Sequence, residues 1–229
     1  MPLLCMKNRQ RSDEKRSPGA SGARAFLMTE GGKWGKIEKR TYEKRDEMEK
    51  IIIRSVTEKD AEELVSIYGP YVLETAVTYE YEVPSVEEFR GRIENTIKNY
   101  PYFVAMEEDI ILGYAYASSF HPRAAFCWSA EVTVYLRKEA HGRGIGRKLY
   151  EKLEEILKKQ NVQTLIALIA DPNPESVAFH EKLGYHVAGR LTDCAYKLGH
   201  WRGMYYMEKF IGDREGEPKQ FIPFPEVEK

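Results

Sequence analysis

Short stretches in which apolar and polar residues alternate predict the strands of this chain. The β-branched run from Ile51 to Val56 indicates a first strand, and the acidic turn Glu107–Asp109 separates two further β-rich runs in the manner of a hairpin. Farther on, Val132, Val134 and Leu136 alternate with polar or aromatic residues. Together the patterns predict strands over 51–56, 102–106, 110–118, 126–136 and 163–170, and two more within 185–210.

Helical spacing of apolar residues predicts four helices between these strands. Thr57 with Asp60 is a variant of the N-cap signal, so a helix follows the first strand. Ser85 and Glu88 form a capping box and predict a second helix starting at 85. An amphipathic helix is expected over 144–159, and a short one over 175–183 is ended by Gly184.

The resulting order is β-α-α-β-β-β-α-β-α-β-β, which predicts a mixed α/β domain over 51–211. The strand, glycine turn, helix and strand from 126 to 170 form a βαβ crossover, so these two strands should be parallel neighbours. Residues 1–50 are rich in charged and small residues and lack an apolar period. They indicate a disordered extension, a basic arm for a nucleic acid or a partner, or a misplaced start with Met28 or Met48 as the first residue.

The tail 212–229 has a similar composition, with three prolines. Its apolar residues leave two alternatives open, docking on the domain or docking on a second subunit; these residues are Phe221, Ile222 and Phe224.

Charge and cysteine usage narrow the class of protein. The 229 residues carry 35 basic and 36 acidic side chains, a balance that argues against an extended nucleic-acid surface on the main body. The longest apolar run, 165–170, is far shorter than the roughly 20 residues that span a bilayer. Three widely spaced cysteines indicate neither a disulfide framework nor a zinc pair, and the five histidines show no paired ligand spacing. We therefore expect a cytoplasmic protein without a metal.

A glycine-rich turn is the first candidate for chemistry. His141-Gly-Arg-Gly-Ile-Gly-Arg147 lies between a predicted strand and a predicted helix, where free N–H groups and the helix dipole suit a phosphate. Its spacing matches neither a Walker loop nor the dinucleotide GxGxxG pattern. An ordinary strand-to-helix turn is therefore the alternative, although Arg143 and Arg147 add positive charge.

This turn and the later segment Asn173-Pro-Glu-Ser-Val-Ala-Phe-His-Glu-Lys-Leu-Gly-Tyr185 resemble the GNAT acetyl-CoA-dependent N-acetyltransferases, over essentially all of 51–211. Two more segments resemble the phosphinothricin and methionine sulfone acetyltransferase branch, His121 to Leu136 and Lys197-Leu-Gly-His-Trp201. Two departures stand out: His141 occupies a position where Gln or Arg is usual, and Arg202 one where an acidic residue is common. The first should be tolerated by a loop that works through its backbone, whereas the second could reshape the pocket.

The resemblance implies a mixed sheet whose parallel strands splay beside acetyl-CoA. It assigns cofactor contacts to the strand end and the turn, together with Asn173; these are Val134, Tyr135, Leu136, His141, Gly142, Arg143, Gly144, Ile145, Gly146 and Arg147. It makes Glu131 the general base, which an amine that is protonated near pH 7 requires. His180 takes the place of a thiolate-protonating tyrosine. The alternatives are a solvated strand-end glutamate, a packed helix histidine and, for Asn173, a turn residue.

Substrate contacts complete the prediction. Arg123 is a candidate for gripping a carboxylate, and a solvated surface arginine is its alternative. Tyr79, Phe126 and Trp128 could line an amino-acid pocket or belong to the core.

We thus expect a homodimeric acetyltransferase that modifies the amine of a small amino acid or analogue by direct transfer. The alternatives are an enzyme for a protein N-terminus, a polyamine or an antibiotic, and a CoA-binding module without turnover.

Overall fold

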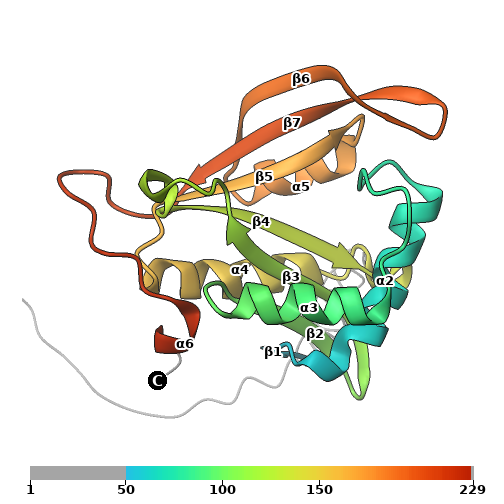
Figure 1. The fold of residues 1–229 in the computed structure, drawn as a ribbon, viewed down its shortest axis with the longest axis horizontal. Coiled ribbons are helices and arrows are strands. Elements are labelled where there is room, and N and C mark those ends of the chain that lie inside the picture. Colours follow the sequence, from blue (N-terminus) through green and yellow to red (C-terminus); the bar gives the residue numbers. More distant parts are fainter. Residues whose placement is uncertain (1–49, 228–229) are drawn as a thin grey trace, which may run out of the picture. The chain divides into compact units, whose positions relative to one another are not determined.

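The computed structural model describes residues 50–227, and the expectations for residues 1–49 lie outside this range. Seven strands form one mixed sheet in the order β1-β2-β3-β4-β5-β7-β6 (Figure 1). Neighbours are antiparallel except β4 and β5. The strands are β1 (Ile51–Ser55), β2 (Tyr102–Glu107), β3 (Ile110–Ser119), β4 (Ser129–Leu136), β5 (Thr164–Asp171), β6 (His186–Lys197) and β7 (His200–Phe210).

The helices follow the predicted order, and their caps explain where two of them start. They are α2 (Ala61–Glu74), α3 (Val86–Ile97), α4 (Ile145–Lys159) and α5 (Pro174–Lys182), with a short α6 (Phe224–Val227) near the end of the chain. The Ser85 hydroxyl accepts the Glu88 N–H at 3.1 Å at the start of α3, as the capping box predicts. Gly144 is the N-cap of α4 at φ 82°, a left-handed conformation that favours glycine. Both α/β class and element order are confirmed.

Two hydrophobic clusters lie on opposite faces of the sheet. The larger contains α4 side chains such as Leu149 and Leu153 packed with Val132, Leu165 and Ala167 from the strands. The second contains side chains of α2 and α3 packed against β2 and β3 and is rich in tyrosine. Successive side chains of a strand point to opposite faces of the sheet. On β4, Val132 belongs to the larger cluster and Tyr135 packs against the second, so the face of every other β4 side chain follows.

The strand predicted over 126–136 starts later than expected, at Ser129. Ala124–Phe126 form a 3-10 helix, and the Phe126 ring packs against His121 with centroids 4.6 Å apart. The predicted strand extended back to Phe126, but hydrogen bonds from the N–H groups of Phe126 and Cys127 to the Arg123 and Ala124 carbonyls hold this part of the chain in a turn.

The C-terminal segment packs on the domain. The Phe224 side chain is buried and contacts Phe103, while Phe221 contacts Tyr100. Gln160, the C-cap residue of α4, donates its side-chain amide to the Ile222 carbonyl at 2.8 Å and accepts the Ile222 N–H at its own main-chain oxygen. These contacts favour the first of the two docking alternatives left open by the sequence.

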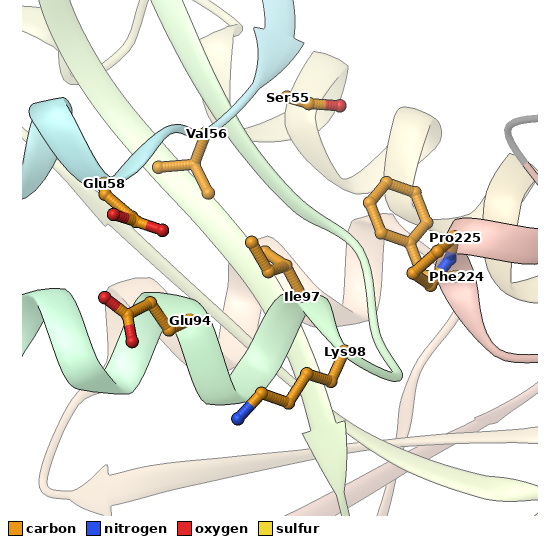
Figure 2. A pocket seen from close by; sticks show the side chains of 8 residues that line it. All are labelled: Ser55, Val56, Glu58, Glu94, Ile97, Lys98, Phe224 and Pro225. Carbon is orange, nitrogen blue, oxygen red and sulfur yellow. The ribbon is translucent and has the colours of Figure 1, made fainter.

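A hollow of about 500 Å³ lies beside this segment (Figure 2). Glu58 and Glu94 face each other across it, with Phe224 and Pro225 along one side. Its lining contains no glycine turn and includes two carboxylates, which disfavours a phosphate-bearing cofactor. Within residues 50–227, no helix has the length and apolar character needed to cross a membrane.

Candidate functional site

The sheet opens between its two parallel strands. Residues 129–131 of β4 pair with 164–166 of β5, and the pairing ends at Glu131 and Ile166. Figure 1 shows the strands diverging beyond this point toward the start of α5. An open sheet leaves main-chain donors and acceptors without a ladder partner, so the gap can accept a ligand with amide groups. The resemblance implied this splayed arrangement.

Hydrogen bonds show which β4 residues face the gap. The Leu136 carbonyl accepts the Tyr71 hydroxyl at 2.6 Å, and Tyr150 on α4 lies 3.4 Å from the Val132 carbonyl. Since strand residues two apart share a side, Val134 also turns its N–H and carbonyl toward the gap. The N–H and carbonyl of Tyr135 point the other way, toward β3, where the carbonyl lies against Gly113. The expectation that the Tyr135 main chain is free for a cofactor is therefore wrong, and the reason is the two-residue period.

The glycine turn leads from the end of β4 into the first turn of α4. Gly144 caps the helix without a side chain, and no side-chain cap bond is formed there. The N–H groups of Ile145, Gly146 and Arg147 consequently have neither an earlier helical carbonyl nor a capping oxygen. With the positive end of the helix dipole, they form a site suited to a phosphate or pyrophosphate.

A cleft of about 490 Å³ joins this turn to the gap between the strands. Most of the predicted cofactor residues line it, including His141, Asn173 and the side of β4 that carries Val134 and Leu136. The structure adds lining residues that the sequence analysis did not single out: Tyr71, Val77, Glu175, Ser176, Phe179 and Lys182. Tyr71 and Val77 come from α2 and the following loop, which carry no motif, whereas the other four lie on α5 within the segment 173–185 that resembles the family.

Two of the predicted cofactor residues have other contacts. Arg143 donates to Glu107 at 2.6 Å and forms an ion pair on β2. Asn173 caps α5, where its side-chain oxygen accepts the Ser176 N–H at 3.1 Å, and it also lines the cleft. Asn173 can therefore be a turn residue and a cofactor contact at the same time, so the two interpretations of it do not exclude each other.

Glu131 lies at the fork, as the last β4 residue paired with β5. Its side chain projects to the face of Thr133 and Tyr135, opposite α4. Among residues 50–227, no hydrogen-bond or ion-pair partner of its carboxylate is found. Burial raises the pKa of Glu131 above its ordinary value. A half-buried carboxylate with a raised pKa and no partner is more basic than a solvated one, which suits a proton acceptor.

Tyrosine side chains form the wall beside Glu131. The centroid of the Tyr135 ring lies 5.0 Å from that of Tyr68 and 5.5 Å from that of Tyr114. Tyr116 on β3 pairs with Thr133 on β4. Burial, with a smaller contribution from the Glu131 charge, raises the pKa of Tyr116 to about 12. The wall is therefore uncharged near neutral pH.

His180 is buried under the same gap and is bonded at both ring nitrogens. Its Nδ1 lies 2.8 Å from the Ser176 carbonyl and its Nε2 lies 2.9 Å from the Tyr150 hydroxyl. A carbonyl only accepts, so Nδ1 carries the proton, and the neutral ring accepts the Tyr150 proton at Nε2. Burial lowers the pKa of His180, which keeps this form near neutral pH. Tyr150, which the sequence analysis missed, lines the gap with His180.

The four predicted substrate residues do not come together. Arg123 is exposed on the β3–β4 loop, near Phe126. Trp128 donates its indole N–H to the Lys219 carbonyl at 2.7 Å, so it serves the C-terminal segment. Tyr79 alone lies beside the end of β5, where its hydroxyl donates to the Gly203 carbonyl. The segment from His121 to Leu136, which contains Arg123, Phe126 and Trp128, indicated a family but gave no common location with Tyr79.

The cleft fits acetyl-CoA by its chemistry. Main-chain groups of Val134 and Leu136 can pair with the amides of a pantetheine arm, and the first turn of α4 can hold a pyrophosphate beside Arg147 and Lys182. Among the described residues, no group of three or more His, Cys, Asp or Glu side chains could hold a metal ion.

Comparisons with known proteins agree with this arrangement. Residues 53–206 match the acetyltransferase (GNAT) domain family. Phosphinothricin N-acetyltransferase of Streptomyces viridochromogenes is 31% identical over 69% of this chain and 87% of its own length. The methionine sulfoximine/methionine sulfone acetyltransferase of Salmonella typhimurium is 26% identical over 69% and 93%.

A solved relative contains the cofactor. The phosphinothricin acetyltransferase of Sinorhizobium meliloti in complex with acetyl-CoA superposes with a TM-score of 0.73, at 31% identity, covering 78% of this chain and 98% of that one. The chain belongs to the GNAT family and is an acetyl-CoA-dependent N-acetyltransferase.

Proposed function

We propose that this enzyme acetylates the α-amine of a small amino acid or analogue, of the phosphinothricin, methionine sulfone or methionine sulfoximine type, by direct transfer without an acyl-enzyme. The observation that carries the proposal is Glu131, a partnerless, half-buried carboxylate at the fork of the split sheet. The names of the relatives support the class of acceptor. Neither Cys127 nor Cys194 lines the gap, so no thiol nucleophile is invoked.

Glu131 accepts the proton that the acceptor amine must lose. An amine of pKa near 8 or above is mostly protonated at pH 7 and attacks only when neutral. The raised pKa of Glu131 brings its basicity closer to that of the amine. The carboxylate takes the proton directly or through one water.

The split sheet holds and polarises the acetyl donor. Acetyl-CoA supplies an activated acetyl thioester. Val134, through the main-chain N–H that faces the gap, polarises the acetyl carbonyl in the manner of an oxyanion hole. The glycine turn, with Arg147 and Asn173, positions the cofactor. Arg143 contributes its main chain and keeps its side chain on Glu107.

Tyr150 and His180 stabilise the departing sulfur. In neutral His180 the nitrogen that faces Tyr150 is an acceptor, so the group that can donate toward the gap is the Tyr150 hydroxyl. Tyr150 has one hydroxyl proton, which must turn from His180 Nε2 to the sulfur as the thiolate departs. Burial raises the pKa of Tyr150 well above that of a thiol, so this proton is donated as a hydrogen bond and is not fully transferred. The thiolate then takes its proton from solvent. His180 acts through Tyr150 by holding its hydroxyl in place.

Assembly and location remain predictions. The β6–β7 hairpin exposes large apolar side chains, Leu191, Tyr196 and Trp201 among them, which supports pairing of two copies. Cys127 and Cys194 are unpaired, which supports a reducing cytoplasm. We propose a cytoplasmic homodimer, testable by light scattering of the purified protein.

The experiment that tests the proposed function is acetyl-CoA turnover, followed by thiol release over a panel of acceptors. The panel contains phosphinothricin, methionine sulfone, methionine sulfoximine, polyamines, an aminoglycoside and a peptide with a free N-terminus. Turnover confined to the amino-acid analogues is the expected result. Turnover confined to polyamines or the peptide would overturn the substrate class, and tight acetyl-CoA binding without any turnover would favour a CoA-binding module.

A further inference from the structure

The tip of the β6–β7 hairpin contacts the loop between α2 and α3. Tyr79 and Tyr81 of this loop donate their hydroxyls to the carbonyls of Gly203 and Tyr196. In return the Lys197 ammonium donates to the Thr78 carbonyl at 2.7 Å. Three side-chain bonds thus fasten the loop against the hairpin, beside the end of β5 where the sheet is open.

Lys197 is a buried cation with one partner. Lys197 is 3% exposed, and among residues 50–227 the Thr78 carbonyl is the one hydrogen-bond partner of its ammonium group. An ammonium carries three donors, so two remain unmatched. Burial lowers the pKa of Lys197, as expected for a cation that has lost water without gaining a carboxylate.

Arg202 lies on the same face of the hairpin. It pairs with Ala195 across the two strands, and Ala195 shares a face with Lys197 two residues away. The opposite face carries Tyr196 and Trp201, whose rings meet at 5.5 Å. The Arg202 Nε is buried without a hydrogen-bond partner, and no ion pair of its guanidinium is found among the described residues. A second cation with unmatched donors therefore lies near the first.

The neighbouring carboxylates are bound by other cations. Glu80, whose charge reaches Lys197, is held by Arg92 at 2.7 Å. Asp171, whose charge reaches Tyr79 together with that of Arg202, is held by Arg190 at 2.6 Å. Among the described residues, the donors of Lys197 and Arg202 are thus left without a carboxylate acceptor, and a bound anion would supply one.

The loop connects this corner to the site of transfer. Val77 lines the gap next to Val134, and the following residue, Thr78, provides the carbonyl that Lys197 binds. The Thr78 hydroxyl lies 2.6 Å from Tyr68, whose ring packs on Tyr135 in the wall beside Glu131. An amino acid bound here would thus have its anionic end near the hairpin and its amine toward the fork.

We infer that Lys197 and Arg202 bind the carboxylate of the acceptor amino acid, the role that the sequence suggested for Arg123. This inference rests on the proposed function and specifies its acceptor site. The carboxylate supplies the missing acceptor for the ammonium and for the guanidinium, and it fixes which nitrogen of the substrate faces Glu131.

The test compares methionine sulfone with its carboxamide, which has the same shape without the negative charge. The wild type is expected to prefer the acid in kcat/KM. In Lys197→Met, and separately in Arg202→Met, the acid-to-amide ratio should fall by at least about 30-fold, since removing one partner of a buried charge pair costs 2 kcal/mol or more. Lys197→Arg should restore part of it. Lys158→Met, on the exposed end of α4, is the matched control and should leave the ratio unchanged.

Binding provides a second readout, by calorimetry of both ligands to the CoA-loaded protein. Equal losses for acid and amide in Lys197→Met would overturn the inference and assign Lys197 to loop anchoring alone. An unchanged ratio in both variants would also overturn it. If the wild type binds the acid more tightly than the amide but acetylates neither, the carboxylate site of Lys197 and Arg202 is supported and the proposed function is overturned. If the wild type neither binds nor acetylates the acid or the amide, both proposals fall.

Discussion

The two sides of the gap between β4 and β5 are built from different chemistry. The cofactor side consists of main-chain groups, in the gap-facing residues of β4 and in the first turn of α4. The proposed acceptor side consists of charged and aromatic side chains, with Glu131 at the fork and Lys197 at the hairpin. One side depends on backbone shape, the other on side-chain identity.

This difference predicts how each side tolerates substitution. A main-chain site survives changes of side chain unless a new atom fills the cleft or distorts the turn. A side-chain site loses its function with the loss of one charge. Substitutions on the two sides should therefore separate effects on kcat and acceptor specificity from effects on the KM for acetyl-CoA.

The largest effect is expected for Glu131→Gln, which keeps the shape and removes the base. We expect kcat to fall by roughly 10² to 10⁴-fold, the usual contribution of general-base catalysis, with an unchanged KM for acetyl-CoA. In the wild type, kcat/KM should rise with pH through the raised pKa of Glu131, because the deprotonated carboxylate is the active form. The variant should lack this rise and keep the one due to the acceptor amine.

The control is Glu155→Gln on the exposed surface of α4, where the carboxylate pairs with Lys152 and Lys159. Its pH profile should match the wild type. A Glu131→Gln variant that retains both the rate and the rise with pH would assign proton removal to another group.

The next effect tests the cofactor side through Gly146→Val. A Cβ at this position would lie 3.2 Å from the Phe179 ring, and Gly146 lines the cleft. The larger side chain must displace Phe179 or enter the space of the cofactor. We expect the KM for acetyl-CoA to rise at least about tenfold, the loss of roughly 1.4 kcal/mol of binding, in steady-state assays.

Gly91→Ala is its control, because a Cβ there meets nothing within 4 Å on α3. An acetyl-CoA KM that is unaffected in Gly146→Val would show that the cofactor does not approach the first turn of α4.

A smaller effect on rate is expected for Tyr150→Phe. The change leaves His180 Nε2 buried without a donor and should lower the free energy of unfolding by about 1 to 3 kcal/mol. We expect kcat to fall by less than about tenfold, since a thiolate leaves without full protonation and only one hydrogen bond is lost. Chemical denaturation and turnover measure the two effects separately. A loss comparable to that of Glu131→Gln would instead make Tyr150 an obligatory acid.

Sequence patterns predicted the fold well because it depends on local chemistry, and most of the residues that they proposed for the cofactor line one cleft. The alternation in β4, the capping box at Ser85 and the glycine turn each fix a backbone segment within a few residues. The two-residue period should also have excluded Tyr135 as a main-chain ligand.

The acceptor side was harder to predict, because its residues come from distant segments. Lys197 donates to Thr78, 119 residues earlier in the chain, and no pattern in either segment indicates this contact. Trp128 faces the C-terminal segment because a tail carbonyl accepts its N–H, a contact that no local pattern contains. Burial of a lone lysine becomes evident only once the hairpin and the loop are in place.

The smallest effect is expected for His141→Gln, and it sharpens the comparison most directly. His141 lines the cleft, and its Nε2 lies 3.0 Å from the Tyr71 hydroxyl, which keeps its own proton on the Leu136 carbonyl. If the turn works through its backbone, glutamine should change the KM for acetyl-CoA by less than about threefold, under 1 kcal/mol. A change above tenfold, with the unfolding transition unaltered, would show that a side chain of the turn binds the cofactor directly. The contrast between a backbone-built and a side-chain-built half of the site would then fail at its most exposed position.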